Sequence, residues 1–397
     1  MKKSSLFIAL TLLTGGILLS PMAANAQDEA QATFERAWYD TCYTKKDAEK
    51  CYQMSKELKL KYPKSQYVPN AEKNVKAYDQ SKAWERFQAA LKAYYTPPQD
   101  APKLDQLFTA GEDYLKIDPG QQYVVGQMAL AGANGAMGGS YKNFDKVKGY
   151  AETGLKSFET TTPPTGWKPE EWLPLREIVL AQMNQYLGWQ VIETKGDPEQ
   201  ALNYLTKATQ VRGKDGAGWK DPNNYWLRST IYSNQYTELR KQYDSLPDDA
   251  AKTGDVGKEI LKKVNELLDT KLIPEYARVI ATATKPEAKG LYDAGKSQFD
   301  AYWKYRTDAP DKAADYIKSY AADPTITSVP VPAKAEDTSN LAAPDAPTAG
   351  ATNVKLSSGG PAMAPGGDAK SATNGNGAKA KPAKSKGSKS KGKKRRG

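Results

Sequence analysis

The sequence offers few side chains that could carry out catalysis. It contains no histidine, which excludes Ser-His-Asp triads, Cys-His pairs, histidine-ligated metals and imidazole acid–base chemistry. Neighbouring acids at Glu170-Glu171 and Asp248-Asp249 are the candidates for carboxylate chemistry. Adjacent residues do not face each other on a helix, and acids at a helix start commonly serve as cap or dipole partners. We therefore expect a protein that is not an enzyme, with no catalytic residue, cofactor or metal ligand.

Two cysteines, Cys42 and Cys51, are the only thiols in the chain. The pattern predicts one helix over residues 29–43 and another from Asp47 to Tyr62, and a hairpin of these two brings the cysteines face to face. In an oxidising compartment we expect a disulfide, which would stabilise the protein by roughly 2–3 kcal/mol. Two buried free thiols are the alternative. A redox-active pair is not indicated, because the spacing is not C-x-x-C.

Two loops repeat one another along the chain. Each has a Gly-Trp-Lys motif, then a proline, then a second tryptophan near the start of a helix. The residues concerned are Trp167, Lys168 and Trp172 in the first loop, and Trp219, Lys220 and Trp226 in the second. In one interpretation each tryptophan is a hydrophobic staple for its helix. In the other, the Trp–Lys edges line a ligand surface, as in a protein that binds cell wall or polysaccharide.

The positive charge of the chain is concentrated in its last segment. The formal net charge is +11, and residues 370–397 hold eleven Lys and Arg and no acid. This basic tail ends in a dense cationic group: Lys384, Lys386, Lys389, Lys391, Lys393, Lys394, Arg395 and Arg396. It is either a solubilising extension or a docking element for anionic lipid, a cell-wall polymer or another polyanion. No aromatic residues interleave the cations, so specific nucleic-acid recognition is not indicated.

The first 26 residues have the pattern of an export signal. Lys2 and Lys3 precede an apolar run from Leu6 to Leu19, and Ala24-Asn25-Ala26 follows as a cleavage site. The run is too short for a membrane anchor, which needs about 20 residues, and no later stretch is apolar enough to span. We expect an exported protein, periplasmic or extracellular, with no transmembrane segment.

The elements that would position these residues are helices. The clearest pair covers residues 181–211, where Gly196-Asp197-Pro198 marks the turn. Glycine ends the first helix, aspartate can cap the second, and proline suits the first helical position because its missing N–H costs nothing there. Ala201, Leu205 and Ala208 then recur at helical spacing, which predicts one buried stripe.

This hairpin resembles a tetratricopeptide repeat. Leu187-Gly188, the Gly196-Asp197 turn, and the stripe of Ala201, Leu205 and Ala208 fall at the signature positions of that family. In addition, Tyr-Pro-x-Ser at residues 62–65, followed by a helix that starts with alanine, resembles repeats of bacterial envelope proteins, notably the Tol–Pal coordinator and the outer-membrane assembly lipoproteins. The resemblance implies an all-α, right-handed solenoid of about six irregular hairpins, because such units need stacked neighbours.

Composition and resemblance together give the expected organisation. Residues 1–26 form the signal peptide, residues 27–323 the helical-repeat domain, and residues 324–397 a disordered tail rich in Ala, Pro, Gly and Lys, with its basic end at 370–397. We expect an exported non-catalytic scaffold that binds a protein or peptide partner through the solenoid and docks through its tail. The alternatives are the polysaccharide binder and, third, a carboxylate-dependent hydrolase of envelope polymers.

Overall fold

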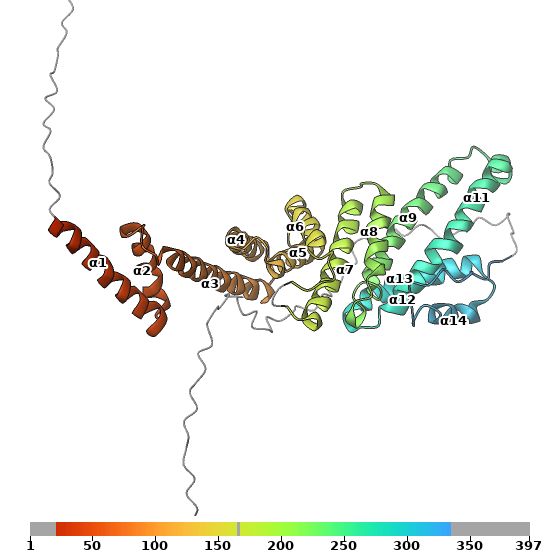
Figure 1. Cartoon of the computed structure of the whole chain (residues 1–397). Helices are drawn as coiled ribbons and strands as arrows, with labels where there is room; N and C mark the ends of the chain where they lie inside the picture. The colour runs from red at the N-terminus through yellow and green to blue at the C-terminus, as the bar shows by residue number, and fades with distance from the viewer. Residues whose placement is uncertain (1–20, 165–166, 335–397) are drawn as a thin grey trace, which may run out of the picture. The chain divides into compact units, whose positions relative to one another are not determined.

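The computed structural model describes residues 21–164 and 167–334, and this part of the chain is all-α (Figure 1). Over these ranges no β-strand forms, and the single antiparallel bridge joins Arg212 to Gly218. The expected all-α class is confirmed. The sequence interpretations that concern residues 1–20 and 335–397, including most of the signal and the whole basic tail, lie outside the described residues.

Three helices form the first part of the described chain: α1 (Pro21–Tyr39), α2 (Ala48–Lys61) and α3 (Val68–Tyr95). Helix α1 therefore runs through the expected cleavage point after residue 26. The side chain of Asp47 caps α2 by accepting a 3.0 Å hydrogen bond from the backbone N–H of Lys50. Trp38 is buried between these helices and donates its indole N–H to Ser55 over 2.8 Å. This small core holds the first hairpin to the start of α3.

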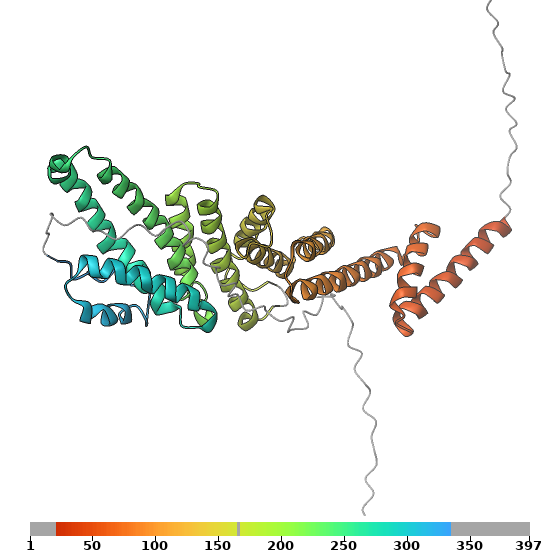
Figure 2. The ribbon, with the colours of Figure 1, turned by 180° about the vertical axis from the view of Figure 1, so that it is seen from behind.

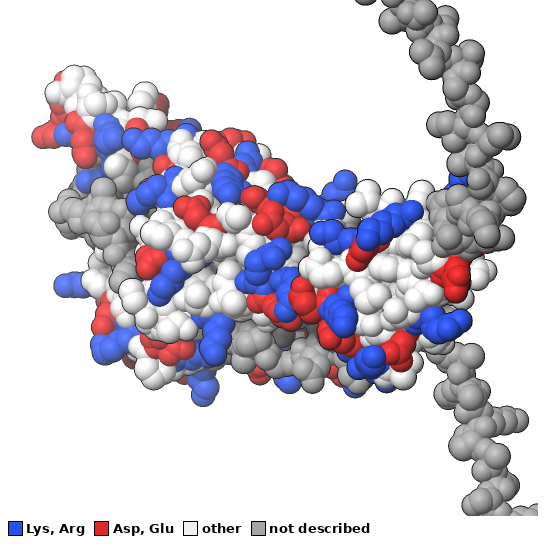
Figure 3. Space-filling model, turned by 90° about the vertical axis from the view of Figure 1, so that its left-hand side faces the viewer, with Lys and Arg blue, Asp and Glu red and all other residues white. Residues whose placement is uncertain are grey.

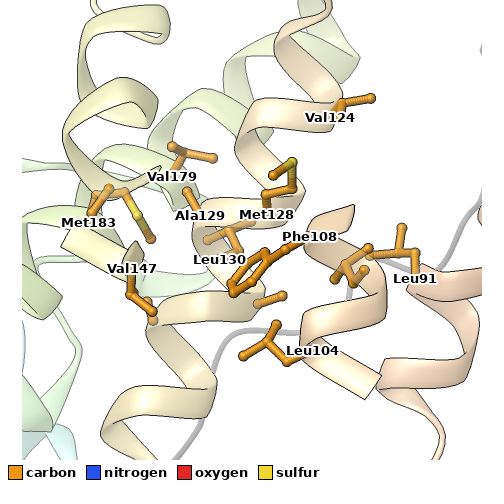
Figure 4. Close-up of a cluster of buried hydrophobic side chains, with 14 of the residues drawn as sticks. Leu91, Leu104, Phe108, Val124, Met128, Ala129, Leu130, Val147, Val179 and Met183 are labelled. Atoms are coloured by element: carbon orange, nitrogen blue, oxygen red, sulfur yellow. The ribbon is translucent and has the colours of Figure 1, made fainter. Parts of the chain in front are cut away.

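The next three helices build the larger core: α4 (Ala101–Ile117), α5 (Gln122–Met137) and α6 (Phe144–Ser157). Helix α5 is buried over most of its length because small residues let its neighbours approach closely. A Cβ at Gly132 would lie 3.2 Å from both Phe108 and Val147. In Figure 4, Phe108 points from α4 toward Leu130 and Val147, so its ring fills the space between three helices. The small residues of α5 are thus explained by close packing.

The central hairpin consists of α7 (Pro169–Glu193) and α8 (Pro198–Gln210), which lie side by side in both ribbon views (Figures 1 and 2). Asp197 caps α8 by accepting a 3.0 Å bond from the N–H of Glu199. Gly188 is the close-approach point, because a Cβ there would lie 2.7 Å from Cγ of Leu205. Local signals and close packing therefore agree at this hairpin.

Beyond the hairpin the chain forms α9 (Pro222–Asp244), α10 (Asp249–Thr253), α11 (Asp255–Leu267) and α12 (Ile273–Thr282). The sequence predicts one helix over residues 257–284 with a kink at Pro274. The structure instead places a π-helical turn at Leu268–Leu272, directly before α12. Proline lacks a backbone N–H and its ring crowds the preceding turn, so the helix adopts the wider π geometry just before Pro274. Helix α12 is buried against α9 and α13.

The described chain ends with α13 (Lys289–Arg306), α14 (Ala313–Lys318) and an extended segment, residues 324–334, which we call the strap. Composition led us to expect disorder from residue 324 onward, and the strap differs from that expectation. Val329 and Val331 pack against the core around α12 and α13. Val329 also donates its N–H to the hydroxyl of Tyr320 over 2.8 Å. These contacts compensate for the ordering entropy, which composition alone could not show.

Candidate functional site

The second tryptophan of each repeated loop belongs to the hydrophobic core. Trp172 is 0% exposed and stacks on Phe158 with 4.7 Å between ring centroids. Trp226 is 3% exposed and meets the ring of Tyr276 edge-on at 6.1 Å. Of the two interpretations, the ligand surface therefore does not hold for Trp172 and Trp226, because both rings are buried in the core.

The first Trp–Lys edge supports the start of α7. Trp167 is half-buried, with its ring 6.0 Å from Tyr123 of α5 and 5.9 Å from Trp172. Lys168 is exposed at the N-cap position of α7. Because Lys168 is the N-cap, Trp167 and Trp172 occupy the N′ and N4 positions of a hydrophobic staple, and the contact with Tyr123 adds a link to α5.

The second Trp–Lys edge is a cation–π cluster. The ring of half-buried Trp219 has the Arg212 guanidinium carbon 4.7 Å from its centroid and Lys220 Nζ 4.5 Å away. Gly218 has a φ of +82°, and a Cβ there would lie 2.5 Å from the carbonyl oxygen of Ala208. The loop therefore needs glycine to turn tightly onto the end of α8, and its cations are drawn to its own tryptophan.

A buried polar cluster joins this loop to α7. Asp221 caps α9 by accepting a 2.9 Å bond from the N–H of Asn223, and its other oxygen accepts a 2.8 Å bond from Gln185. Gln185 also donates to the side-chain oxygen of Asn224 over 3.0 Å. Burial raises the pKa of the Asp221 carboxyl, although the hydrogen bond from Gln185 opposes the rise. These hydrogen bonds join α7 to the start of α9, so we interpret the cluster as structural.

Cys42 and Cys51 are joined by a disulfide, with their Cα atoms 4.9 Å apart. The bond links the π-helical turn at Asp40–Thr44 to the first turn of α2. Cys51 is buried and receives a 3.4 Å contact from the amide nitrogen of Asn74 on α3. The disulfide therefore fastens the first hairpin at its turn.

An apolar groove, which we call the hairpin groove, lies between the α7–α8 turn and α9 and encloses about 620 Å³. Its apolar lining comes from both arms of the hairpin and from α9: Val191, Ile192, Pro198, Ala201, Ile231 and Leu239. Polar side chains, including Lys195, Gln235 and Glu238, line it as well. The sequence analysis did not find this groove. The hairpin could be predicted, but the relative position of α9 could not.

Two kinds of feature, clusters of side chains that could hold a metal ion and helices that could span a membrane, are absent from residues 21–164 and 167–334. These residues contain no group of three or more Cys, Asp or Glu that could hold a metal ion. Over the same ranges no helix combines the length and apolar content needed to cross a bilayer. On the face drawn in Figure 3, basic side chains lie among acidic ones rather than in a field of one sign. The basic tail, Lys384 to Arg396, lies outside the described residues.

Comparisons with known proteins name no relative for this chain. No family model matches it, and no curated protein or solved structure matches it. The tetratricopeptide resemblance of the central hairpin therefore depends on its own residues, and the function has to be argued from the geometry above.

Proposed function

We propose that this chain is an exported, non-catalytic scaffold of the bacterial cell envelope that holds a protein partner in the hairpin groove. In this proposal the basic tail docks the scaffold on an anionic envelope surface. The proposal is supported by the export pattern of residues 1–26, the cationic residues of the tail, and a preformed apolar groove in the helical part.

The hairpin groove is the observation that carries the proposal. Its apolar lining comes from α7, α8 and α9, and the groove is open in this structure. Its polar lining carries one positive and one negative side chain, Lys195 and Glu238. An amphipathic helix offers an apolar stripe for such a lining and polar flanks for such a rim. We therefore expect the partner to contribute a helix of this kind.

Photo-crosslinking in the living cell tests this proposal. A photoreactive residue at Gln235 reports on the hairpin groove in the full chain as it is exported. Val191→Glu places a carboxylate in the groove, and Val256→Glu makes the same change at a valine that is 63% exposed on α11. We expect a crosslinked protein adduct that Val191→Glu reduces at least about tenfold, since a buried unpaired charge costs several kcal/mol, and that Val256→Glu leaves unchanged.

Two results would contradict the groove as the partner site. One is an adduct of unchanged yield in a Val191→Glu variant whose thermal unfolding matches that of Val256→Glu. The other is the absence of any protein adduct at Gln235 while crosslinkers at exposed positions on other helices capture a partner.

Docking by the tail is tested separately on anionic lipid vesicles. Each Lys or Arg near an anionic membrane contributes about 1 kcal/mol, and salt screens this attraction. We expect retention of the full chain that declines steeply with added salt, and its loss when residues 370–397 are deleted. Equal retention of the shortened chain would remove the tail from the proposal and leave the groove untouched. Fractionation of cells into cytosol and envelope tests the export.

A further inference from the structure

A second cavity has a volume of about 520 Å³. It lies where the strap meets α8, α9, α12 and the π-helical turn at Leu268–Leu272. We call it the basic pocket, because four cationic side chains line it: Arg212, Arg228, Lys271 and Arg278. The acid that lines it is Glu275. These residues come from positions far apart in the sequence, and none of them was a candidate at the level of sequence.

Glu275 is held by two guanidinium groups at once. It is almost fully buried, and its Oε1 accepts a 2.8 Å bond from Arg228 and a 3.0 Å bond from Arg278. The single negative charge of Glu275 is therefore shared by two positively charged arginines, one buried and one half-buried. Arg278 also donates to the strap, at 2.7 Å to the carbonyl oxygen of Pro324, 3.0 Å to that of Ile326 and 3.3 Å to the hydroxyl of Ser328. Arg278 is thus committed to building the wall of the pocket.

The other cations are less fully compensated. Arg212 pairs with Asp323 at 3.0 Å. Arg228 keeps a buried Nε with no hydrogen-bond partner among the described residues. Lys271 is exposed, and within the same part of the chain no carboxylate lies at ion-pair distance from it. Four positive charges against the carboxylates of Glu275 and Asp323 leave two positive charges uncompensated at the basic pocket.

Hydroxyl groups complete the lining. Thr206 of α8 and Thr327 of the strap line the same cavity as the cations. The hydroxyl of Thr325 also lines it but donates to Asp323 over 2.6 Å, so it is not counted among the donors for an anion. A hydroxyl can donate a hydrogen bond to an anion that is also bound by a guanidinium or ammonium group. Hydrogen bonds to a charged acceptor are shorter and stronger than those between neutral groups. The basic pocket thus combines excess positive charge with neutral donors.

We propose that the basic pocket binds a phosphate monoester group. Such a group carries about 1.5 to 2 negative charges at neutral pH and three acceptor oxygens, which matches two uncompensated cations and several donors. A single carboxylate would neutralise only one of those charges. The volume leaves room for the organic group of a monoester beside its phosphate. This binding is independent of the hairpin groove, so either proposal can fail without the other.

Titration calorimetry of the full chain tests the proposal, with inorganic phosphate, glycerol phosphate and succinate as separate probes. The first two distinguish the free ion from the ester, and succinate supplies two negative charges without phosphorus. Lys271→Gln removes one pocket cation, while Lys262→Gln removes an exposed cation of α11 that does not line the cavity. Both variants retain the tail, so any binding by the tail is common to them.

We expect saturable binding of glycerol phosphate that weakens about tenfold in Lys271→Gln, the effect of losing one charge-assisted hydrogen bond. Lys262→Gln should retain the parent affinity, and added salt should weaken binding in both proteins. Equal losses in the two variants would overturn the proposal, because they would indicate diffuse attraction. So would succinate binding as tightly as glycerol phosphate, or no saturable binding of either phosphate probe.

Discussion

Arg278 and Arg212 both bond the strap, but one side chain is buried and the other is exposed. This difference in burial predicts different losses of stability when each arginine is replaced. Arg278 is 7% exposed and bonds the strap carbonyls of Pro324 and Ile326. Arg212 is 51% exposed and bonds the side chains of Asp323 and Thr325. Replacing either arginine with methionine keeps most of the side-chain volume and removes the charge.

The expected costs differ severalfold. Arg278→Met leaves buried Glu275 with one guanidinium partner instead of two, and breaking a buried pair costs about 3–5 kcal/mol. The two carbonyl bonds would contribute a comparable amount, but water replaces them once the strap is released. Arg212→Met breaks an exposed ion pair and a cation–π contact with Trp219, and together these should cost about 1 kcal/mol. In a domain of this size the first change lowers the melting temperature on the order of 10 °C.

Urea unfolding followed by circular dichroism measures both free energies of unfolding. Limited trypsin digestion provides a local measurement, because Lys334 at the end of the strap donates its N–H to the carbonyl of Arg306 and is protected while the strap is docked. Cleavage there should accelerate strongly in Arg278→Met and slightly in Arg212→Met. Equal free-energy losses in the two variants, or a loss below about 1 kcal/mol for Arg278→Met, would refute the argument from burial.

Three further predictions concern the disulfide, the central hairpin and the dependence on pH. Cys51→Ser should cost about 2–3 kcal/mol in urea unfolding, and reductant should lower the parent by the same amount and leave the variant unchanged. Gly188→Ala should destabilise by about 1–2 kcal/mol because its Cβ meets a leucine, whereas Gly149→Ala has open space and should stabilise by about 0.5–1 kcal/mol; thermal unfolding compares them. A hydrogen bond from Arg212 lowers the pKa of Asp323 from 3.8 to about 2. That carboxylate therefore stabilises the fold fully above about pH 4 and progressively less down to pH 2, and Asp323→Asn should remove this small acid-dependent part of the unfolding free energy.

The helices themselves could be predicted because their signals are local. Asp47 and Asp197 each accept a hydrogen bond from a backbone N–H in the first turn of the following helix, as an N-cap does. The break near Pro274 was placed within a few residues, although as a kink rather than a π-helical turn. Interactions between residues a few positions apart decide these features, so a single stretch of sequence carries the information.

The candidate sites could not be predicted in the same way. Trp167 and Trp172 look alike in the sequence, yet the first is half-buried beside α5 and the second lies fully in the core. The hairpin groove requires the position of α9 beside α8, and the basic pocket requires α12 and the strap. The type of a side chain alone does not predict which neighbouring segments will bury a tryptophan ring or pair with an arginine.

By itself, the sequence determined that the chain is helical, where its clearest hairpin turns, and which segment carries the excess positive charge. Only the tertiary structure decided which aromatic rings are covered, that residues 324–334 are packed, and that Arg228, Lys271 and Arg278 surround one cavity. The physical reason is the range of the interactions. Helix formation and capping act within a few residues, whereas burial and charge compensation depend on segments that only folding brings together.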